Sequence, residues 1–310
     1  MIELRQVTKK YGPLEALHEV SFTAPRGQIT GLLGVNGAGK TTALNILTGY
    51  FPPTAGQVLV DGMDMLTDSA RCKRQIGFLP EKPPIYDEMT VREYLTFASR
   101  LREVEARSIP AHVREIIGLC GLEEAADRTL GRLSKGYRQR AGFAQALCGA
   151  PPVLVLDEPT VGLDPRQVAE IRELMRRLGE KHTIIFSSHL LSEVQQLCSR
   201  VVILHHGRVL REANLGDMME DGGTLRLRVS IALGESRLLP ALRSLPCVRR
   251  VKTLPTQDAA VTEAVLECDA AQDPQTQLFH LLAAMDAPLR LLYPERDSLE
   301  DVFLRATEEG

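Results

Sequence analysis

An apolar run that ends in a glycine-rich loop constrains this chain more than any other feature. Gly27–Leu33 is typical of a buried strand, and the loop from Gly34 to Thr41 fits G-x-x-x-x-G-K-[ST] at the start of a predicted helix over Lys40–Thr48. Glycines let backbone N–H groups approach phosphate oxygens closely, and the start of a helix adds the positive end of its dipole. The pattern therefore predicts a phosphate-binding loop within an α/β fold.

The loop also carries the side chains that chemistry on a triphosphate requires. Lys40 can make a charge-assisted contact to the β- and γ-phosphates, and the Thr41 hydroxyl can ligate Mg²⁺. A glycine-rich turn that arises by chance is the alternative for this motif taken alone. The loop residues that we expect to bind nucleotide are Gly34, Asn36, Gly37, Ala38, Gly39, Lys40, Thr41 and Thr42.

Two adjacent carboxylates end a second apolar strand, predicted over Val153–Asp157. Asp157 is placed to hold Mg²⁺, directly or through water. Glu158 is placed to polarise the attacking water as a general base, an effect typically worth about 10²–10⁴-fold. The alternative is a strand that leaves into a solvated acidic loop, but a phosphate loop already requires a downstream carboxylate for its metal. The two motifs together predict a Mg²⁺-dependent nucleotide hydrolase.

Composition is that of a globular protein and argues against several other classes. The 310 residues allow one large domain and a smaller one, with 44% hydrophobic and 25% charged residues. A net charge of −3 gives no electrostatic reason to expect a nucleic-acid partner. Six scattered cysteines without a Cys-x-x-Cys pair favour buried apolar thiols in a reducing compartment over zinc or disulfides.

A membrane span is not expected in this sequence. A spanning helix needs about 20 consecutive apolar residues, whereas the longest candidates, Ile29–Val35 and Val153–Leu156, are short and end at polar residues. The first residues, Met1–Arg5, lack the apolar core of a signal peptide. We therefore expect a soluble chain whose membrane role, if it has one, depends on a partner.

Further motifs in a fixed order narrow the class of ATPase. Leu133-Ser-Lys-Gly-Tyr137, followed by Arg-Gln-Arg, resembles the signature motif of ATP-binding cassette (ABC) ATPases and stands upstream of the acidic strand, as in that family. Thr160-Val-Gly-Leu-Asp164 resembles the D-loop, and His189 matches the switch histidine. Tyr11 matches the aromatic residue that stacks on adenine. Taken singly, each could be a packing or surface residue; their shared order identifies the chain as a member of the ABC family.

The resemblance implies how the chain would work. Two copies, or this chain and a homologous ATPase, would sandwich two ATP molecules head to tail. The Ser134 hydroxyl and Gly136 N–H of one copy would then reach the γ-phosphate held by Lys40 of the other. His189 would contact the γ-phosphate as a catalytic residue, and Asp164 would link the two sites across the interface.

Two departures from the family pattern affect the candidate site. The family usually has Gln at the end of the strand that enters the helical subdomain, where this chain has Glu81. Glu81 is either a third metal contact or only a coupling residue, because it adds negative charge beside a triphosphate. Lys135 and Tyr137 replace Gly and Gln of the signature, whereas Ser134 and Gly136, which would contact the phosphate, are retained.

The expected fold is α/β: a P-loop ABC ATPase with a mixed sheet core, an antiparallel subsheet and a helical subdomain, followed by a small α+β ferredoxin-like domain. We predict a nucleotide-binding domain over 1–218 with its helical subdomain at about 84–135, a linker at 219–223, and the accessory domain over 224–310. Further strands of the first domain are expected at Gln57–Val60, Gln75–Leu79, Thr183–Ser187 and Arg200–Leu204.

The accessory domain is predicted from the order of its elements, βαββαβ. A closing helix is expected over Ser298–Ala306. The six elements are predicted at Leu225–Ile231, Glu235–Leu245, Val248–Leu254, Ala260–Cys268, Pro274–Met285 and Leu289–Tyr293.

The resemblance also implies a role in transport. One ATPase domain without spanning helices or a coiled-coil insertion points to a separate ATPase subunit, peripheral on the cytoplasmic face of the membrane through a polytopic permease. The helical subdomain and the Glu81–Tyr94 segment would grip that partner. Asp297–Leu304 is similar to the terminal motif of bacterial ABC-2-type exporter ATPases, which favours export. An importer subunit and a soluble regulatory ABC ATPase remain the alternatives.

Overall fold

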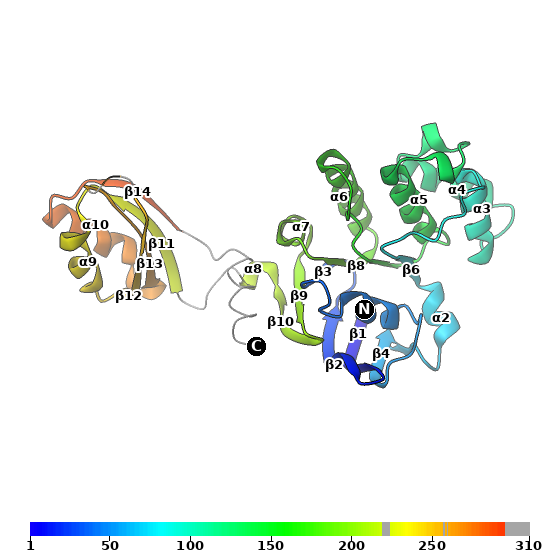
Figure 1. Ribbon diagram of the computed structural model, residues 1–310, viewed down its shortest axis with the longest axis horizontal. Coiled ribbons are helices and arrows are strands. Elements are labelled where there is room, and N and C mark those ends of the chain that lie inside the picture. Colours follow the sequence, from blue (N-terminus) through cyan, green and yellow to red (C-terminus); the bar gives the residue numbers. More distant parts are fainter. Residues whose placement is uncertain (219–223, 257, 259, 295–310) are drawn as a thin grey trace. The chain divides into compact units, whose positions relative to one another are not determined.

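The computed structural model comprises two compact units, the first formed by Met1–Leu215 and the second beginning at Gly216 (Figure 1). The structure describes residues 1–218, 224–256, 258 and 260–294. The expected linker at 219–223, the closing helix over Ser298–Ala306 and the terminal motif Asp297–Leu304 therefore lie outside the described residues.

The first unit is built on a six-stranded sheet in the order β10-β9-β3-β8-β7-β6. Its five strands other than β10 run parallel, and β10 pairs antiparallel with β9 at one edge. The parallel strands are continuous apolar runs because both of their faces are covered. The strands are β3 (Ile29–Leu33), β6 (Ile76–Leu79), β7 (Val153–Leu156), β8 (Thr183–Ser188), β9 (Arg200–His205) and β10 (Arg208–Asn214).

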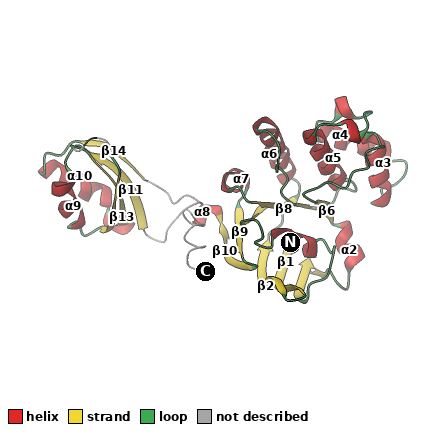
Figure 2. Ribbon diagram, in the orientation of Figure 1, coloured by secondary structure: helices red, strands yellow, loops and turns green. Residues whose placement is uncertain are grey.

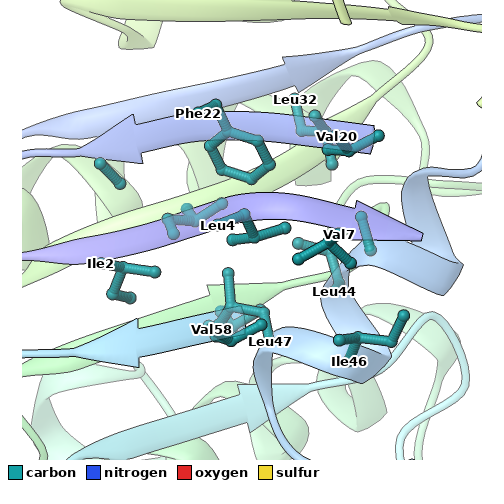
Figure 3. Close-up of a cluster of buried hydrophobic side chains, with 14 of the residues drawn as sticks. Ile2, Leu4, Val7, Val20, Phe22, Leu32, Leu44, Ile46, Leu47 and Val58 are labelled. Atoms are coloured by element: carbon teal, nitrogen blue, oxygen red, sulfur yellow. The ribbon is translucent and has the colours of Figure 1, made fainter. Parts of the chain in front are cut away.

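A second, antiparallel sheet in the order β2-β1-β4-β5 packs with helix α1 (Lys40–Leu47). Figure 3 shows Ile2, Leu4 and Val7 of β1 directed toward Leu44 and other side chains of α1, β2 and β4. This buried cluster continues into the six-stranded sheet, so α1 joins the two sheets through one core. The strands are β1 (Ile2–Tyr11), β2 (Leu14–Ala24), β4 (Ala55–Val60) and β5 (Met63–Asp64).

Three helices form a bundle that contacts the β6 edge of the six-stranded sheet (Figure 1). They are α3 (Val91–Leu101), α4 (Ile109–Leu119) and α5 (Lys135–Leu147). Thr90 and Glu93 begin α3 with a reciprocal capping box, in which each side chain bonds to the other residue's backbone N–H. The remaining helices of the unit are α2 (Ser69–Arg74), α6 (Pro165–Gly179) and α7 (Leu191–Leu197), with short 3₁₀ turns at Glu123–Ala125 and Leu130–Arg132.

The second unit has the ferredoxin-like order of elements and strands (Figure 2). Its antiparallel sheet runs β12-β13-β11-β14, and both helices bury their leucines against the same face. The short helix α8 (Leu215–Met218) precedes the sheet. The elements are β11 (Thr224–Ile231), α9 (Glu235–Arg243), β12 (Val248–Leu254), β13 (Thr262–Asp269), a 3₁₀ turn (Ala270–Gln272), α10 (Pro274–Ala284) and β14 (Leu289–Pro294).

The predicted fold class is confirmed, with small differences at the ends of elements. The parallel-strand predictions agree with β3, β6, β7, β8 and β9 to within two residues at each end. The patterns predicted no individual strand before Gly27, yet β1 and β2 occupy that region. Gln6 and Glu19 have φ of 49° and 47° there, and the β1–β2 pairing shifts register, so alternation is interrupted. No helix in the described part of the chain is long and apolar enough to cross a membrane.

The second unit should fold when produced alone as residues 216–310, because it has its own buried core. Leu266→Ala within that fragment should lower the unfolding free energy by about 2–5 kcal/mol, since Leu266 is fully buried. Cooperative denaturant unfolding followed by circular dichroism measures both. A fragment without a cooperative transition would contradict the independence of the unit.

Candidate functional site

The phosphate loop is shaped by close backbone approaches that only glycine allows. A Cβ on Gly34 would lie 2.4 Å from the Leu204 carbonyl oxygen on β9. Gly39 has a φ of 104°, and a Cβ there would lie 2.8 Å from the Ala16 carbonyl oxygen. These contacts draw the loop against β2 and β9 while α1 begins at Lys40, which leaves its first N–H groups directed toward the loop.

Lys40 is buried and held by three oxygen atoms. Its ammonium group donates to the carbonyl oxygens of Gly34 at 2.7 Å and Val35 at 3.2 Å. It also lies 3.3 Å from Oε1 of Glu158. The other carboxylate oxygen of Glu158 is 2.8 Å from Nδ1 of His189. The structure therefore brings the expected lysine, general base and switch histidine into one connected group.

Asp157 lies beside this group at the end of β7. It is 1% exposed, and the Ser187 hydroxyl donates to its Oδ1 at 2.6 Å. Burial raises the pKa of the Asp157 carboxyl, and the negative charges of Glu158 and Glu81 act in the same direction. Hydrogen bonds from the hydroxyls of Ser187 and Thr41 oppose that rise. These two hydrogen bonds therefore do not offset the cost of burying an ionised Asp157, which a nearby cation would lower.

The backbone at Glu158 adopts a conformation that is unusual for a residue with a side chain. Its φ is 45°, and its N–H donates to the Ser187 hydroxyl oxygen at 2.8 Å. Such left-handed geometry costs of order 1–3 kcal/mol and persists only where surrounding contacts maintain it. Ser187 thus holds both residues of the motif, donating its proton to the Asp157 carboxylate and accepting from the backbone N–H of Glu158.

Tyr11 lies at the end of β1, on the wall of the same cleft. Its ring is half-exposed at 43% and stands edge-to-face with Phe51 at 6.0 Å between centroids. The Lys9 ammonium lies 5.3 Å from the Tyr11 ring centroid. The free face of an aromatic ring in this position can accept a planar base.

Most of the predicted nucleotide-binding residues border one cleft of about 630 Å³. It is bounded on one side by the phosphate loop and on the other by the loops that follow β6, β7 and β8. Its lining consists of Tyr11, Leu14, Ala16, Asn36, Gly37, Gly39, Lys40, Thr41, Thr42, Glu81, Glu158, Val161 and His189.

Ser134, Gly136 and Asp164 border a different cleft, of about 720 Å³. Ser134 is the N-cap of α5 and accepts from the Tyr137 N–H at 3.4 Å. Asp164 caps α6 by accepting from the Gln167 N–H at 2.9 Å. The expected site residues thus form two groups, and neither cleft contains the full set.

Glu81 is exposed but borders the phosphate-loop cleft, so the structure is compatible with both of its proposed roles. Among the described residues, no cluster of three or more His, Cys, Asp and Glu side chains has the geometry of a metal site. The oxygens available beside the loop are the carboxylates of Asp157 and Glu81 and the hydroxyl of Thr41. Hard oxygen donors of this kind suit Mg²⁺, which keeps several ligands from water and phosphate.

The two signature replacements have different surroundings. Lys135 extends toward the D-loop, since a Cβ on Gly162 would lie 2.0 Å from the Lys135 ammonium. Tyr137 is partly buried, and the Arg140 guanidinium lies 6.0 Å from its ring centroid. Neither side chain alters the start of α5, where Ser134 and Gly136 lie.

Three residues of the site were missed by sequence reasoning because their partners are distant in the chain. Ser187 holds Asp157, Gln139 donates to the Pro159 carbonyl oxygen at 2.8 Å, and Glu193 contacts Thr160. The sequence did offer a signal for Ser187, because Ser187 and Ser188 are two polar residues at the end of an apolar strand. The buried positions of Gln139 and Glu193 on helices carried no such signal.

The fold and the phosphate-loop cleft define a P-loop nucleotide-binding protein. Residues 17–161 match the ABC transporter family. The Nod factor export ATP-binding protein I of Rhizobium sp. (strain N33) is 36% identical over 308 residues, covering 99% of this chain and 96% of that protein. The chain therefore belongs to the ATP-binding proteins of ABC transporters, which bind and hydrolyse ATP.

Other relatives and solved structures agree with this assignment. The linearmycin resistance ATP-binding protein LnrL of Bacillus subtilis (strain 168) is 30% identical, covering 99% of this chain and 98% of that one. The bacitracin transport ATP-binding protein BcrA of Bacillus licheniformis is 36% identical, covering 68% and 69%. The dimeric structure of MJ0796, a bacterial ABC transporter cassette, has a TM-score of 0.64 and 28% identity, covering 69% of this chain and 99% of that one.

Asp157→Asn should raise the melting temperature of the nucleotide-free protein at pH 7 in EDTA. Because the folded pKa of Asp157 is raised, its favourable contribution exists below the usual value of 3.8 and is lost as pH rises through the folded pKa. The gain should therefore be larger at pH 7 than at pH 4, measured by thermal unfolding. Glu81→Gln removes only a charge that acts weakly on Asp157, so it should raise the melting temperature less. An equal rise of the Asp157→Asn melting temperature at pH 4 and pH 7 would contradict the electrostatic cause.

Proposed function

We propose that this chain is the ATPase subunit of an ABC exporter and acts as a dimer with two composite ATP sites. The observation that supports this most directly is the separation of its site residues into two clefts on one chain. A head-to-tail partner would bring Ser134 and Gly136 of its own chain to the nucleotide held by Lys40. Each copy would then complete the site of the other.

Each residue of the phosphate-loop cleft has a role in this proposal. Tyr11 stacks on adenine, and backbone N–H groups of the loop bind the phosphates. Lys40 leaves the carbonyl oxygens and Glu158 to contact the β- and γ-phosphates. Glu158, freed from Lys40 but still beside His189, accepts the proton of the attacking water, and His189 contacts the γ-phosphate.

Thr41, Asp157 and Glu81 are the residues that would hold Mg²⁺. The donor set fits, because it offers hard oxygens and because burial, together with the charges of Glu158 and Glu81, raises the pKa of Asp157, a position that a cation would stabilise. Mg²⁺ would neutralise charge on the phosphate oxygens. Asp164 would lie at the dimer interface and link the two sites.

The membrane partner would dock where the helical bundle meets the sheet. A cleft of about 420 Å³ there is bordered by Tyr86, Tyr94 and Phe97 together with Arg74 and Arg102. Tyr86 is half-exposed and stands edge-to-face with Phe97 at 5.7 Å between centroids. Aromatic rings rimmed by charge suit a helix end presented by a polytopic permease. This arrangement would place the chain on the cytoplasmic face of the membrane.

Export is supported by relatives that match along the whole chain. The Nod factor export protein covers both units of this chain, so the match extends beyond the cassette into the ferredoxin-like unit. The names of relatives also mention bacitracin transport and linearmycin resistance. An importer subunit and a soluble regulatory ATPase lack comparable support here.

A Glu158→Gln variant should form a stable ATP-bound dimer, because binding is retained while proton acceptance is lost. Light scattering in Mg²⁺-ATP should give twice the monomer mass, and the unsubstituted chain should show ATPase activity that rises with protein concentration. A monomer under these conditions would contradict the composite site.

Complementation between two inactive variants tests the same arrangement without trapping. Lys40→Ala and Ser134→Ala should each lose activity alone. Their equimolar mixture should regain activity, because a mixed dimer has one site with Lys40 from one chain and Ser134 from the other. Activity that never exceeds the sum of the two separate variants would argue against head-to-tail pairing.

Tyr86→Arg should weaken co-purification with the permease while leaving concentration-dependent ATP hydrolysis intact. The substitution replaces an exposed ring with charge at the docking cleft, remote from the ATP residues. Affinity purification from membranes measures the first effect, and hydrolysis by the purified chain measures the second. Leu101→Arg at the same cleft is a matched variant; retention of the permease by both would place the docking surface elsewhere.

A further inference from the structure

A buried carboxylate outside the expected site holds together two of its loops. Glu193, in the first turn of α7, is 2% exposed. The Thr160 hydroxyl donates to its Oε1 at 2.5 Å, and the Ser188 hydroxyl donates to its Oε2 at 2.8 Å. Both of these partners are neutral hydroxyls. A buried carboxylate is costly unless its oxygens are satisfied, so its presence here calls for a functional reason.

Each partner belongs to a loop that carries a site residue. Thr160 lies in the loop between Glu158 and Asp164. Its carbonyl oxygen accepts from the Leu163 N–H at 3.2 Å, which closes a turn. Ser188 immediately precedes His189, and its hydroxyl oxygen also accepts from the Leu190 N–H at 2.9 Å. The Ser188 hydroxyl therefore links Glu193 to the backbone N–H of Leu190, and these two bonds fix the backbone on both sides of His189.

The same turn is held from its other side by the signature helix. Gln139 of α5 is 5% exposed, and its Nε2 donates to the Pro159 carbonyl oxygen at 2.8 Å. A continuous set of buried contacts thus leads from α5 through Pro159 and Thr160 to Glu193. From Glu193 it continues through Ser188 to the backbone of His189. In the proposed dimer, α5 faces the partner's ATP, whereas His189 faces the chain's own.

We propose that Glu193 is a positioning residue that sets His189 relative to the Thr160 turn and couples the two ATP sites. The inference rests on the proposed composite-site function. Glu193 acts through Ser188 and Thr160 and touches no reacting atom. A shift of the γ-phosphate contact at His189 would be transmitted to the turn that carries Asp164, because the carboxylate joins both loops directly.

The carboxylate is required because it can accept from two hydroxyls at once. Glutamine has one acceptor oxygen, and its NH₂ group cannot accept from Ser188. A Glu193→Gln chain must therefore reverse this hydrogen bond and turn the Ser188 proton toward its other acceptor, the Leu190 carbonyl oxygen at 3.5 Å, although the shape and volume of the side chain are retained. Thr160→Val removes the other donor with a similarly small change in shape.

The test uses steady-state ATP hydrolysis by the full-length chain. Glu193→Gln should lower kcat by about 10–100-fold with KM for ATP unchanged, because a small displacement of the histidine affects the reaction more than binding. The Hill coefficient for ATP should fall toward one, since the coupling between sites is lost. Glu173→Gln, an exposed glutamate on α6, is the matched control and should leave all three quantities unchanged.

A double-mutant cycle separates positioning from general destabilisation. Thr160→Val should lower kcat similarly, and the double variant should lose less than the two single changes add up to, because both changes act through the same carboxylate. Thr160→Ser restores the hydroxyl and should recover most of kcat. Additive effects in the cycle, an unchanged kcat in Glu193→Gln, or equal losses in kcat and ATP affinity would overturn the inference.

The experiments distinguish a failure of the proposed dimeric ATPase function from a failure of the role of Glu193. An unsubstituted chain without ATPase activity at any concentration would contradict the proposed function and this inference with it. An active, cooperative unsubstituted chain with an unaffected Glu193→Gln variant would overturn the role of Glu193 alone. If Glu193→Gln does not fold, Thr160→Val and Thr160→Ser provide the same comparison.

Discussion

The buried contact between Lys40 and Glu158 is the constraint on which the site depends. Lys40 is 6% exposed and lies 3.3 Å from the carboxylate that is proposed to accept the proton of water. Buried ions of this kind are stable only while each has a partner, and removing one partner costs about 3–5 kcal/mol. Triphosphate can replace Glu158 as the partner of Lys40. Nucleotide binding would then free the carboxylate, so that binding and activation of the proposed base would be one exchange.

The two clefts show why a second copy is needed. Ser134 and Asp164 each cap a helix, α5 and α6, and both lie away from the phosphate loop of their own chain. Helix starts are effective anion sites, but the cleft at the starts of α5 and α6 is not lined by the phosphate loop of the same chain. In the proposed composite site, hydrolysis would therefore wait for a partner copy. The dimeric solved relative is consistent with that requirement.

Sequence reasoning located the parts of the site that are local in the chain. The loop around Lys40, the carboxylates after β7 and the residues Ser134 and His189 all lie where the motifs predicted them. The supporting contacts could not be predicted in this way, because Gln139 and Pro159 are 20 residues apart and Thr160 and Glu193 are 33 apart. These contacts form only when α5 and α7 pack against the loop that follows β7. The β1 and β2 strands were missed for a different reason, since bulges interrupt their alternation.

Charge explains why a divalent cation would assist nucleotide binding in this cleft. Burial raises the pKa of Asp157 there, and the negative charges of Glu158 and Glu81 act in the same direction. Lys40 supplies one positive charge against them. Bringing a triphosphate to such a site adds repulsion that one lysine cannot offset, so ATP without metal should bind weakly. A glutamate at position 81 increases this dependence relative to the glutamine usual in the family, because it adds a charge that Mg²⁺ must also neutralise. The departure at Glu81 would thus act on the electrostatics of the proposed metal site whether or not its oxygen becomes a ligand.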